Sequence, residues 1–243
     1  MTEAQPQKSD LGVRTLSAVV MVAVAGTALW LGGWWWTAFV LLVTVGVLRE
    51  WTTLANGFVK TMIARLIWFV GGVAYVGMAG FVLMALRNEG EGLLVILALL
   101  LAVIATDVGA YFSGRTFGGP KIAPRISPSK TWSGLVGGML LSAIGLTLIF
   151  CGIDPAAAAD AWWQIVLAGM LIAVVAQSGD FFESWMKRRA GVKDSSNLIP
   201  GHGGLFDRLD GLLAVLFVAG LMALIGAAWP AQSSHVEMME LHQ

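Results

Sequence analysis

The chain has 243 residues, of which 57% are hydrophobic and only 12% are charged, and its formal net charge is zero. A soluble domain carries roughly 25% charged residues, so this chain has too little charge to cover itself in water. The charge balance also argues against a nucleic-acid partner, and the single cysteine, Cys151, excludes an intrachain disulfide.

Seven apolar stretches are long enough to cross a bilayer, which takes about 20 mainly apolar residues in a helix. In chain order they cover 12–31, 34–54, 62–86, 92–113, 133–152, 162–186 and 210–229. We therefore predict an all-α fold, a polytopic transmembrane bundle of about seven helices. Residues 1–90 are expected to anchor and pack, residues 91–232 to form the catalytic region, and residues 233–243 to form a polar tail.

The distribution of Lys and Arg predicts the orientation of these helices, because basic residues gather on the cytoplasmic side of a membrane. With a cytoplasmic N-terminus, only Arg87 of the 15 Lys and Arg residues falls outside. We therefore expect the N-terminus in the cytoplasm and the C-terminus outside. The two long polar loops, 114–132 and 187–209, then lie together at the cytoplasmic face.

Acidic residues at membrane depth are the first candidates for a functional site. Such a carboxylate costs several kcal/mol unless it is paired, hydrated or metal-bound; for any single one, a snorkelling acid or a structural salt bridge is the alternative. Asp180 and Glu183 are three residues apart, as are Asp207 and Asp210, so each pair shares one helical face. If the two faces converge, they offer the oxygen ligands that Mg²⁺ prefers. Asp107 is a further candidate.

The polar loops are rich in groups that bind phosphate. Loop 187–209 carries several basic residues and a glycine-rich run, 197–204, and exposed glycine amides suit a polyanion. In loop 114–132, residues 127–131 place hydroxyls and a lysine before the next helix, where another anion can bind. The alternative is contact with anionic lipid, which we prefer only for Lys60 and Arg65. His202 is suited either to phosphate or acid–base chemistry, or to a loop-stabilising hydrogen bond.

The segment 184–210 resembles the signature of the phosphatidate cytidylyltransferase family. It contains Ser, Lys-Arg, Lys-Asp, Pro-x-His-Gly-Gly and Asp-Arg-x-Asp at the spacing of that signature. Segments 105–112 and 126–134 also resemble the family, and the resemblance covers roughly residues 100–229. One departure is Ser133, which stands where family members commonly have Glu.

This resemblance implies an enzyme of phospholipid biosynthesis that transfers the cytidylyl group of CTP to phosphatidic acid, giving CDP-diacylglycerol and pyrophosphate. It implies Mg²⁺ as cofactor, with K⁺ as a second cation. The protein is then expected in the bacterial inner membrane, in contact with membrane lipid, with its site facing the cytoplasm. A homodimer is one arrangement that the sequence leaves open.

The site residues that the resemblance implies fall into three groups. The metal ligands are expected to be Asp180 and Asp207, supported by Glu183 and Asp210. The catalytic residues are expected to be Asp180, Asp207, Asp210, Lys187, Arg188 and His202. Substrate binding is expected from Ser127, Ser129, Lys130, Thr131, Lys193, Asp194, Gly203, Gly204 and Arg208.

Other functions remain as alternatives. A cytidylyltransferase for a different lipid phosphate and a CTP-dependent lipid kinase are related in class. A CDP-alcohol phosphotransferase is not favoured, because its Asp-Gly-x-x-Ala-Arg run is missing. An ion-coupled transporter also places acids inside a helix bundle, but transporters often show internal repeats and broken helices near the midplane. Here the acids lie at one face, beside phosphate-type loops.

Overall fold

The computed structural model describes residues 11–88 and 90–228, so the predicted tail 233–243 lies outside the described residues. The described part folds into α-helices joined by short connections and one small hairpin. The elements are α1 (Leu11–Leu31), α2 (Gly33–Phe58), α3 (Met62–Asn88), α4 (Gly92–Phe117), β1 (Lys121–Ala123), β2 (Ser127–Thr131), α5 (Trp132–Ile153), α6 (Pro155–Asp160), α7 (Trp162–Ala190) and α8 (Phe206–Ala228). Seven of the helices are long and apolar enough to cross a membrane, which confirms the predicted all-α bundle.

The helices are longer than hydropathy predicts at the ends that carry polar residues. Helix α4 continues beyond residue 113 to Phe117, and ends at Gly118 and Gly119, whose φ angles of 60° and 98° favour glycine. Helix α7 continues to Ala190 and ends at Gly191, which has φ 73° and donates its backbone N–H to the carbonyl oxygens of the last turn. Consequently the second polar loop shortens to residues 191–205.

The first polar loop contains a β-hairpin in place of irregular structure. Strands β1 and β2 pair antiparallel, with Lys121 opposite Thr131 and Ala123 opposite Ser127. The Thr131 side chain accepts a hydrogen bond from the backbone N–H of Gly134 and thereby caps α5. The hairpin is therefore fixed to the first turn of α5.

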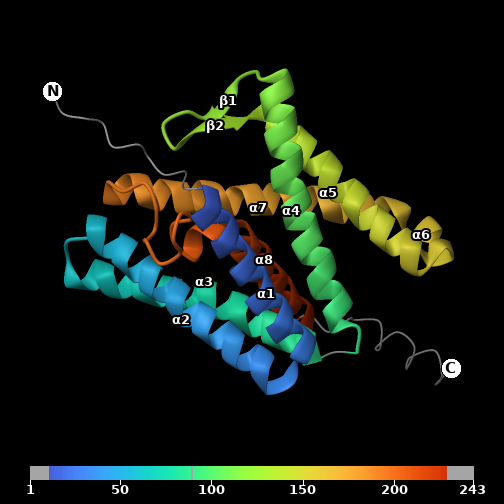
Figure 1. Ribbon diagram of the computed structural model, residues 1–243, viewed down its shortest axis with the longest axis horizontal. Coiled ribbons are helices and arrows are strands. Elements are labelled where there is room, and N and C mark those ends of the chain that lie inside the picture. The colour runs from blue at the N-terminus through green and yellow to red at the C-terminus, as the bar shows by residue number, and fades with distance from the viewer. Residues whose placement is uncertain (1–10, 89, 229–243) are drawn as a thin grey trace, which may run out of the picture.

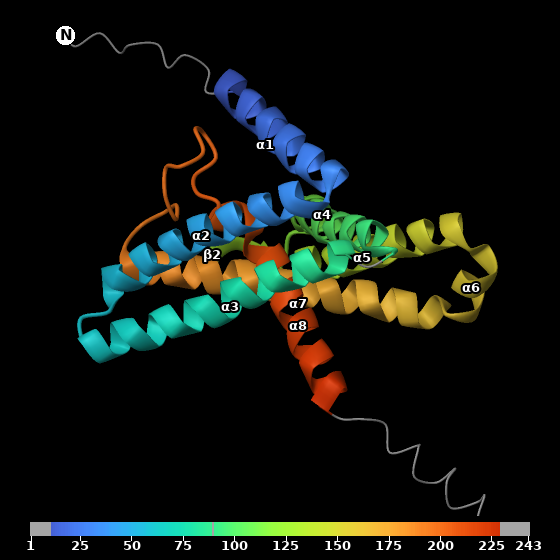
Figure 2. The ribbon, with the colours of Figure 1, turned by 90° about the horizontal axis from the view of Figure 1, so that it is seen from below.

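Helices α2, α3 and α7 extend along the long axis of the molecule, whereas α4 runs across it (Figure 1) and α1 and α8 are oblique to it (Figure 2). The C-terminal ends of α2 and α7 lie at one end, and α6 lies at the opposite end. Arg87, at the end of α3, donates a hydrogen bond to the carbonyl oxygen of Leu29 near the end of α1. The one basic residue predicted to lie outside is therefore on the side of the α1–α2 turn, away from loop 191–205.

A buried core joins α2, α3, α7 and α8 near loop 191–205. Trp51 of α2 packs against the rings of Tyr75, Phe182 and Phe206, and its indole N–H donates to the carbonyl oxygen of Trp68. Burial of such aromatic rings contributes most of the stabilisation in a core of this kind. Because Phe206 begins α8, this core fixes the start of the helix that carries Asp207 and Asp210.

Candidate functional site

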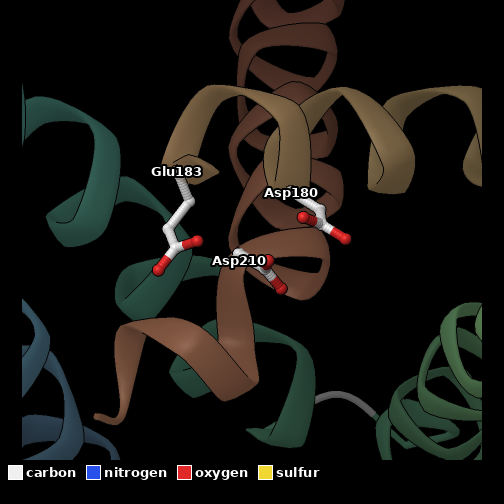
Figure 3. A group of neighbouring side chains, drawn as sticks. All are labelled: Asp180, Glu183 and Asp210. Atoms are coloured by element: carbon white, nitrogen blue, oxygen red, sulfur yellow. The ribbon is translucent and has the colours of Figure 1, made fainter. Parts of the chain in front are cut away.

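Three carboxylates converge where α7 crosses α8. Asp180 and Glu183 come from α7 and Asp210 comes from α8 (Figure 3). One oxygen of each carboxylate lies within 4.8 Å of the others. The convergence predicted from the spacing of the acids is therefore confirmed for these three residues.

Glycine permits the close crossing that brings these carboxylates together. A Cβ atom at Gly179 would overlap the carbonyl oxygen of Asp210 and lie 2.6 Å from the Cβ of Ala214. On the opposite helix, a Cβ at Gly211 would lie 3.3 Å from the carbonyl oxygen of Ala176. The two backbones therefore touch directly beside Asp180 and Asp210, as small residues allow between membrane helices.

Lys187 lies between two buried acids on one side of this cluster. Its Nζ atom is 2.5 Å from Glu183 Oε2 and 2.7 Å from Asp207 Oδ1. The side chains of Glu183 and Asp207 are 1% and 4% exposed, so water does not solvate their carboxylates. Lys187 therefore provides the positive counter-charge that both of them need. Apart from this ion pair, neither oxygen of Glu183 accepts a hydrogen bond from a described residue. These oxygens therefore retain lone pairs for a cation.

Asp207 has a different environment from Asp210, although the two residues are one helical turn apart. Its Oδ2 atom accepts hydrogen bonds of 2.8 Å from the backbone N–H of Ser195, the hydroxyl of Ser195 and the backbone N–H of Gly204. It therefore holds loop 191–205 on the first turn of α8. Asp207 lies outside the group formed by Asp180, Glu183 and Asp210.

Glu50 is a buried acid that the sequence analysis missed. It comes from α2, is 5% exposed, and accepts hydrogen bonds from the hydroxyl of Ser196 and from the backbone N–H groups of Leu205 and Phe206. Its Oε2 atom also lies 3.0 Å from the hydroxyl of Ser195. The available signal was an acid inside the predicted span 34–54, which by the reasoning applied to the other acids is a candidate.

The two glycines of the Pro-x-His-Gly-Gly run lie against these acids. Gly203 has φ 83°, and a Cβ there would lie 2.8 Å from Asp207 Oδ2. At Gly204 a Cβ would lie 2.6 Å from both carboxylate oxygens of Glu50. Any larger residue would therefore displace the loop from Asp207 and Glu50.

The hairpin contributes the second lysine of the site. Lys130 of β2 forms an ion pair with Asp180, and its Nζ lies 4.8 Å from the ring centroid of Phe181. Arg188 donates a hydrogen bond of 3.3 Å to the carbonyl oxygen of Ile126, which joins the end of α7 to the hairpin. Residues from two distant segments thus meet beside the acidic cluster.

A cavity of about 500 Å³ lies between α4, the hairpin and α5. Its lining includes the predicted residues Asp107, Ser129, Lys130 and Thr131. It also includes residues that were not predicted: Tyr111, Arg115, Lys121 and Gln177. The buried Nε2 atom of Gln177 has no hydrogen-bond partner among the described residues. The cavity therefore combines positive charge with open hydrogen-bonding groups and adjoins the cluster through the Lys130–Asp180 pair.

The remaining predicted residues lie on the hairpin, on loop 191–205 and in the first turn of α8. Ser127 is buried at the start of β2, and Lys193 and Asp194 are exposed on the loop. Arg208 donates from Nε to the carbonyl oxygen of His202, at 3.1 Å. The His202 Nδ1 atom is buried without a partner among the described residues. None of these five residues lines the cavity in the described part of the chain.

Ser133, the position of the departure from the family pattern, lies at the start of α5. Its hydroxyl donates to the carbonyl oxygen of Gly118 and lies 3.1 Å from the hydroxyl of Thr131. Ser133 therefore links the end of α4 to the start of α5. It also lines a second hollow, of about 330 Å³, with the apolar side chains of Phe117, Trp132 and Leu140.

The fold and site thus define an integral membrane protein with clustered carboxylates beside a basic cavity. The model of the cytidylyltransferase family matches residues 57–225. A phosphatidate cytidylyltransferase of Brucella suis is 34% identical over 90% of this chain and 94% of its own length. Those of Pseudomonas aeruginosa and Rickettsia bellii are 38% and 32% identical, over 88% of this chain and 77% and 93% of their own lengths. The chain belongs to the cytidylyltransferase family, and the resemblance seen in segment 184–210 is confirmed.

Proposed function

We propose that this protein transfers the cytidylyl group of CTP to phosphatidic acid, forming CDP-diacylglycerol and pyrophosphate in phospholipid biosynthesis. The similarity to phosphatidate cytidylyltransferases along most of the chain supports this reaction. The observation that carries the proposal for the site is the convergence of Asp180, Glu183 and Asp210 beside a cavity with basic side chains. Phosphoryl transfer needs mainly such positioning and charge stabilisation.

We propose that Asp180, Glu183 and Asp210 hold Mg²⁺. The donor set suits this ion, because Mg²⁺ prefers carboxylate oxygens and completes its shell with water and substrate phosphate. When bound, Mg²⁺ would neutralise charge on the triphosphate and stabilise the departing pyrophosphate. Asp207 stays a predicted ligand, although its contacts to Lys187 and Ser195 favour a supporting role. For the proposed K⁺, the described residues provide no separate acidic group of three or more.

The cavity is the proposed site of the CTP triphosphate. Arg115, Lys121 and Lys130 supply positive charge, and the hydroxyls of Ser129 and Thr131 lie in the same lining. Lys130 also contacts Asp180, so a phosphate held by this lysine lies next to the proposed metal ligands. A charge-assisted hydrogen bond of this kind is roughly twice as strong as a neutral one.

The phosphate oxygen of phosphatidic acid is the proposed nucleophile. It forms a bond to the α-phosphorus of CTP while the bond from that phosphorus to the pyrophosphate oxygen breaks. No side chain has to act as nucleophile, since the lipid phosphate supplies its own oxygen. Lys187 and Arg188 are proposed to stabilise the charge that develops, and Lys193, Asp194, His202 and Arg208 to complete substrate binding from loop 191–205 and α8.

The site is proposed to face the cytoplasm from the inner membrane of a bacterium. The bias of Lys and Arg towards the end that carries loop 191–205 supports this orientation, and the named relatives are bacterial. CTP is dissolved in the cytoplasm and phosphatidic acid lies in the leaflet, so the reaction requires a site at their boundary. The proposed homodimer can be tested by the mass of the purified protein in detergent.

The proposed reaction is tested by identifying the products of purified protein in detergent with CTP, phosphatidic acid and Mg²⁺. The proposal predicts CDP-diacylglycerol and pyrophosphate in equal amounts by mass spectrometry and phosphate analysis. A lipid kinase would instead give CDP and a phosphorylated lipid. If folded protein converts neither CTP nor phosphatidic acid, other lipid phosphates are the next substrates to test, and a transporter follows only if those fail as well.

A further inference from the structure

Glu50 has an environment that its place in an apolar helix does not explain. It lies in α2, is buried, and contacts residues 145 to 156 positions later in the chain. Its Oε1 atom accepts from the Ser196 hydroxyl at 2.6 Å and from the Leu205 N–H at 3.0 Å. Its Oε2 atom accepts from the Phe206 N–H at 2.7 Å and lies 3.0 Å from the Ser195 hydroxyl. One carboxylate thus joins the first half of the loop, its last residue and the start of α8 to α2.

The chemistry of these contacts requires a carboxylate at position 50. The groups around Glu50 are hydroxyls and backbone N–H groups, which can all donate, and an ionised carboxylate only accepts. A Gln side chain has almost the same shape. However, its NH₂ group would place N–H donors against the donors of the loop, where the Glu50 carboxylate offers lone pairs. Gly204 adds a steric requirement, since the absence of a side chain there lets Glu50 approach the loop.

A short chain of contacts connects Glu50 to the acidic cluster. The Ser195 hydroxyl lies 3.0 Å from Glu50 Oε2 and 2.8 Å from Asp207 Oδ2, so it bridges the two carboxylates. Asp207 in turn lies 2.7 Å from Lys187 through its other oxygen. Lys187 then contacts Glu183, one of the three converging acids. Displacement of the loop would therefore change the position of Asp207 and of the lysine that it holds.

We propose that Glu50 is a positioning residue for the acidic site. It holds loop 191–205 against α2 and α8, and through Ser195 it fixes the Asp207 carboxylate that keeps Lys187 beside Glu183. The effect on turnover rests on the proposed cytidylyl transfer, whereas the effect on the loop does not. Groups that orient the residues around a metal commonly change metal affinity or activity by about 10- to 100-fold when they are removed.

The test compares Glu50→Gln with the matched control Glu91→Gln, which makes the same exchange at the exposed N-terminal end of α4. The first measurement is the rate of tryptic cleavage after Lys193, an exposed residue of the loop, in detergent without substrate. We expect cleavage about tenfold faster in Glu50→Gln, the factor that follows from losing one hydrogen bond to a charged group. We expect Glu91→Gln to be cleaved like the wild type.

The second measurement is the CDP-diacylglycerol turnover per folded molecule, as a function of Mg²⁺ concentration. We expect Glu50→Gln to need about tenfold more Mg²⁺ for half-maximal turnover or to lose at least about tenfold in kcat. Faster cleavage with unchanged kcat and Mg²⁺ dependence would overturn the proposal, because Glu50 would then only stabilise the loop. Values within about twofold of Glu91→Gln in both measurements would overturn it as well.

The experiment also distinguishes failure of the proposed reaction from failure of the Glu50→Gln variant to fold. If wild type makes no CDP-diacylglycerol but Glu50→Gln is still cleaved faster, the proposed reaction fails and the role of Glu50 in holding the loop stands. If Glu50→Gln does not fold, Ser195→Ala decides, because it removes the hydroxyl between Glu50 and Asp207 and leaves three hydrogen bonds of Glu50 in place. Unchanged turnover and Mg²⁺ dependence in Ser195→Ala would overturn the proposal.

Discussion

Lys187 is the residue whose removal should reveal most about how α7 and α8 are held together. Lys187→Met keeps an unbranched side chain but leaves Glu183 and Asp207 facing each other without a counter-charge. Breaking a buried ion pair in this way costs about 3–5 kcal/mol. Because Lys187 is itself 14% exposed, we expect the lower part of that range, about 3–4 kcal/mol.

The expected loss of stability can be measured by thermal unfolding of purified protein in detergent. In a chain of this length, 1 kcal/mol corresponds to about 2–4 °C in Tm, so Lys187→Met should unfold about 6–16 °C lower than the wild type. Lys60→Met removes an exposed lysine at the α2–α3 turn and should leave Tm nearly unchanged.

A second substitution distinguishes charge repulsion from lost packing. Glu183→Gln combined with Lys187→Met should unfold at a higher temperature than Lys187→Met alone, since one of the two unpaired carboxylates is gone. The reasoning is refuted if Lys187→Met has the same Tm as Lys60→Met. It is refuted equally if neutralising Glu183 brings no recovery.

Two further predictions concern the helix crossing and the cavity. Gly179→Ala should push α8 away from α7, with a cost of about 1–3 kcal/mol and a loss of CDP-diacylglycerol synthesis, because its Cβ would overlap Asp210. Gly71→Ala, where a Cβ would meet nothing within 4 Å, is the control in both thermal unfolding and turnover assays. Equal Tm and equal turnover of the two variants would contradict the close contact between α7 and α8 at Gly179. Lys130→Ala should raise the KM for CTP about tenfold while Lys60→Ala leaves it unchanged, and equal effects in steady-state kinetics would remove the hairpin from the nucleotide site.

The helices and the shared face of Asp180 and Glu183 were predictable because both depend on local patterns. An apolar stretch of about 20 residues is a strong signal for a membrane helix. The spacing of Asp180 and Glu183 places both on one face of α7 regardless of the rest of the fold. The ends of the helices were harder to predict, because hydropathy falls at polar residues while the helical backbone hydrogen bonds continue to the next glycine. Helix α4 therefore extends through Arg115 to Phe117.

The different roles of Asp207 and Asp210 could not be predicted from their spacing. Both lie on one face of α8, yet Asp207 is in the first turn and accepts hydrogen bonds from the preceding loop. Asp210 is one turn further on, where α7 crosses at Gly179. Which acid meets the loop and which meets α7 depends on the angle between the helices. The sequence does not encode that angle locally.

Glu50 was missed for a related reason. It lies beside Arg49 in an otherwise apolar stretch, where an acid next to a base suggests a local pair at the membrane surface. Its partners are in loop 191–205 and at the start of α8, at least 145 residues away. Only the tertiary contact between α2 and α8 brings these groups together.

The most direct test of the account is the effect of Asp210→Asn on CDP-diacylglycerol formation from CTP, phosphatidic acid and Mg²⁺. The substitution keeps the shape of the side chain and removes one of the three converging carboxylates. We expect the wild type to form product, and Asp210→Asn to elute as folded protein with turnover lower by about 100-fold or more. Near-normal turnover by Asp210→Asn would contradict the claim that the acids between α7 and α8 form the catalytic centre.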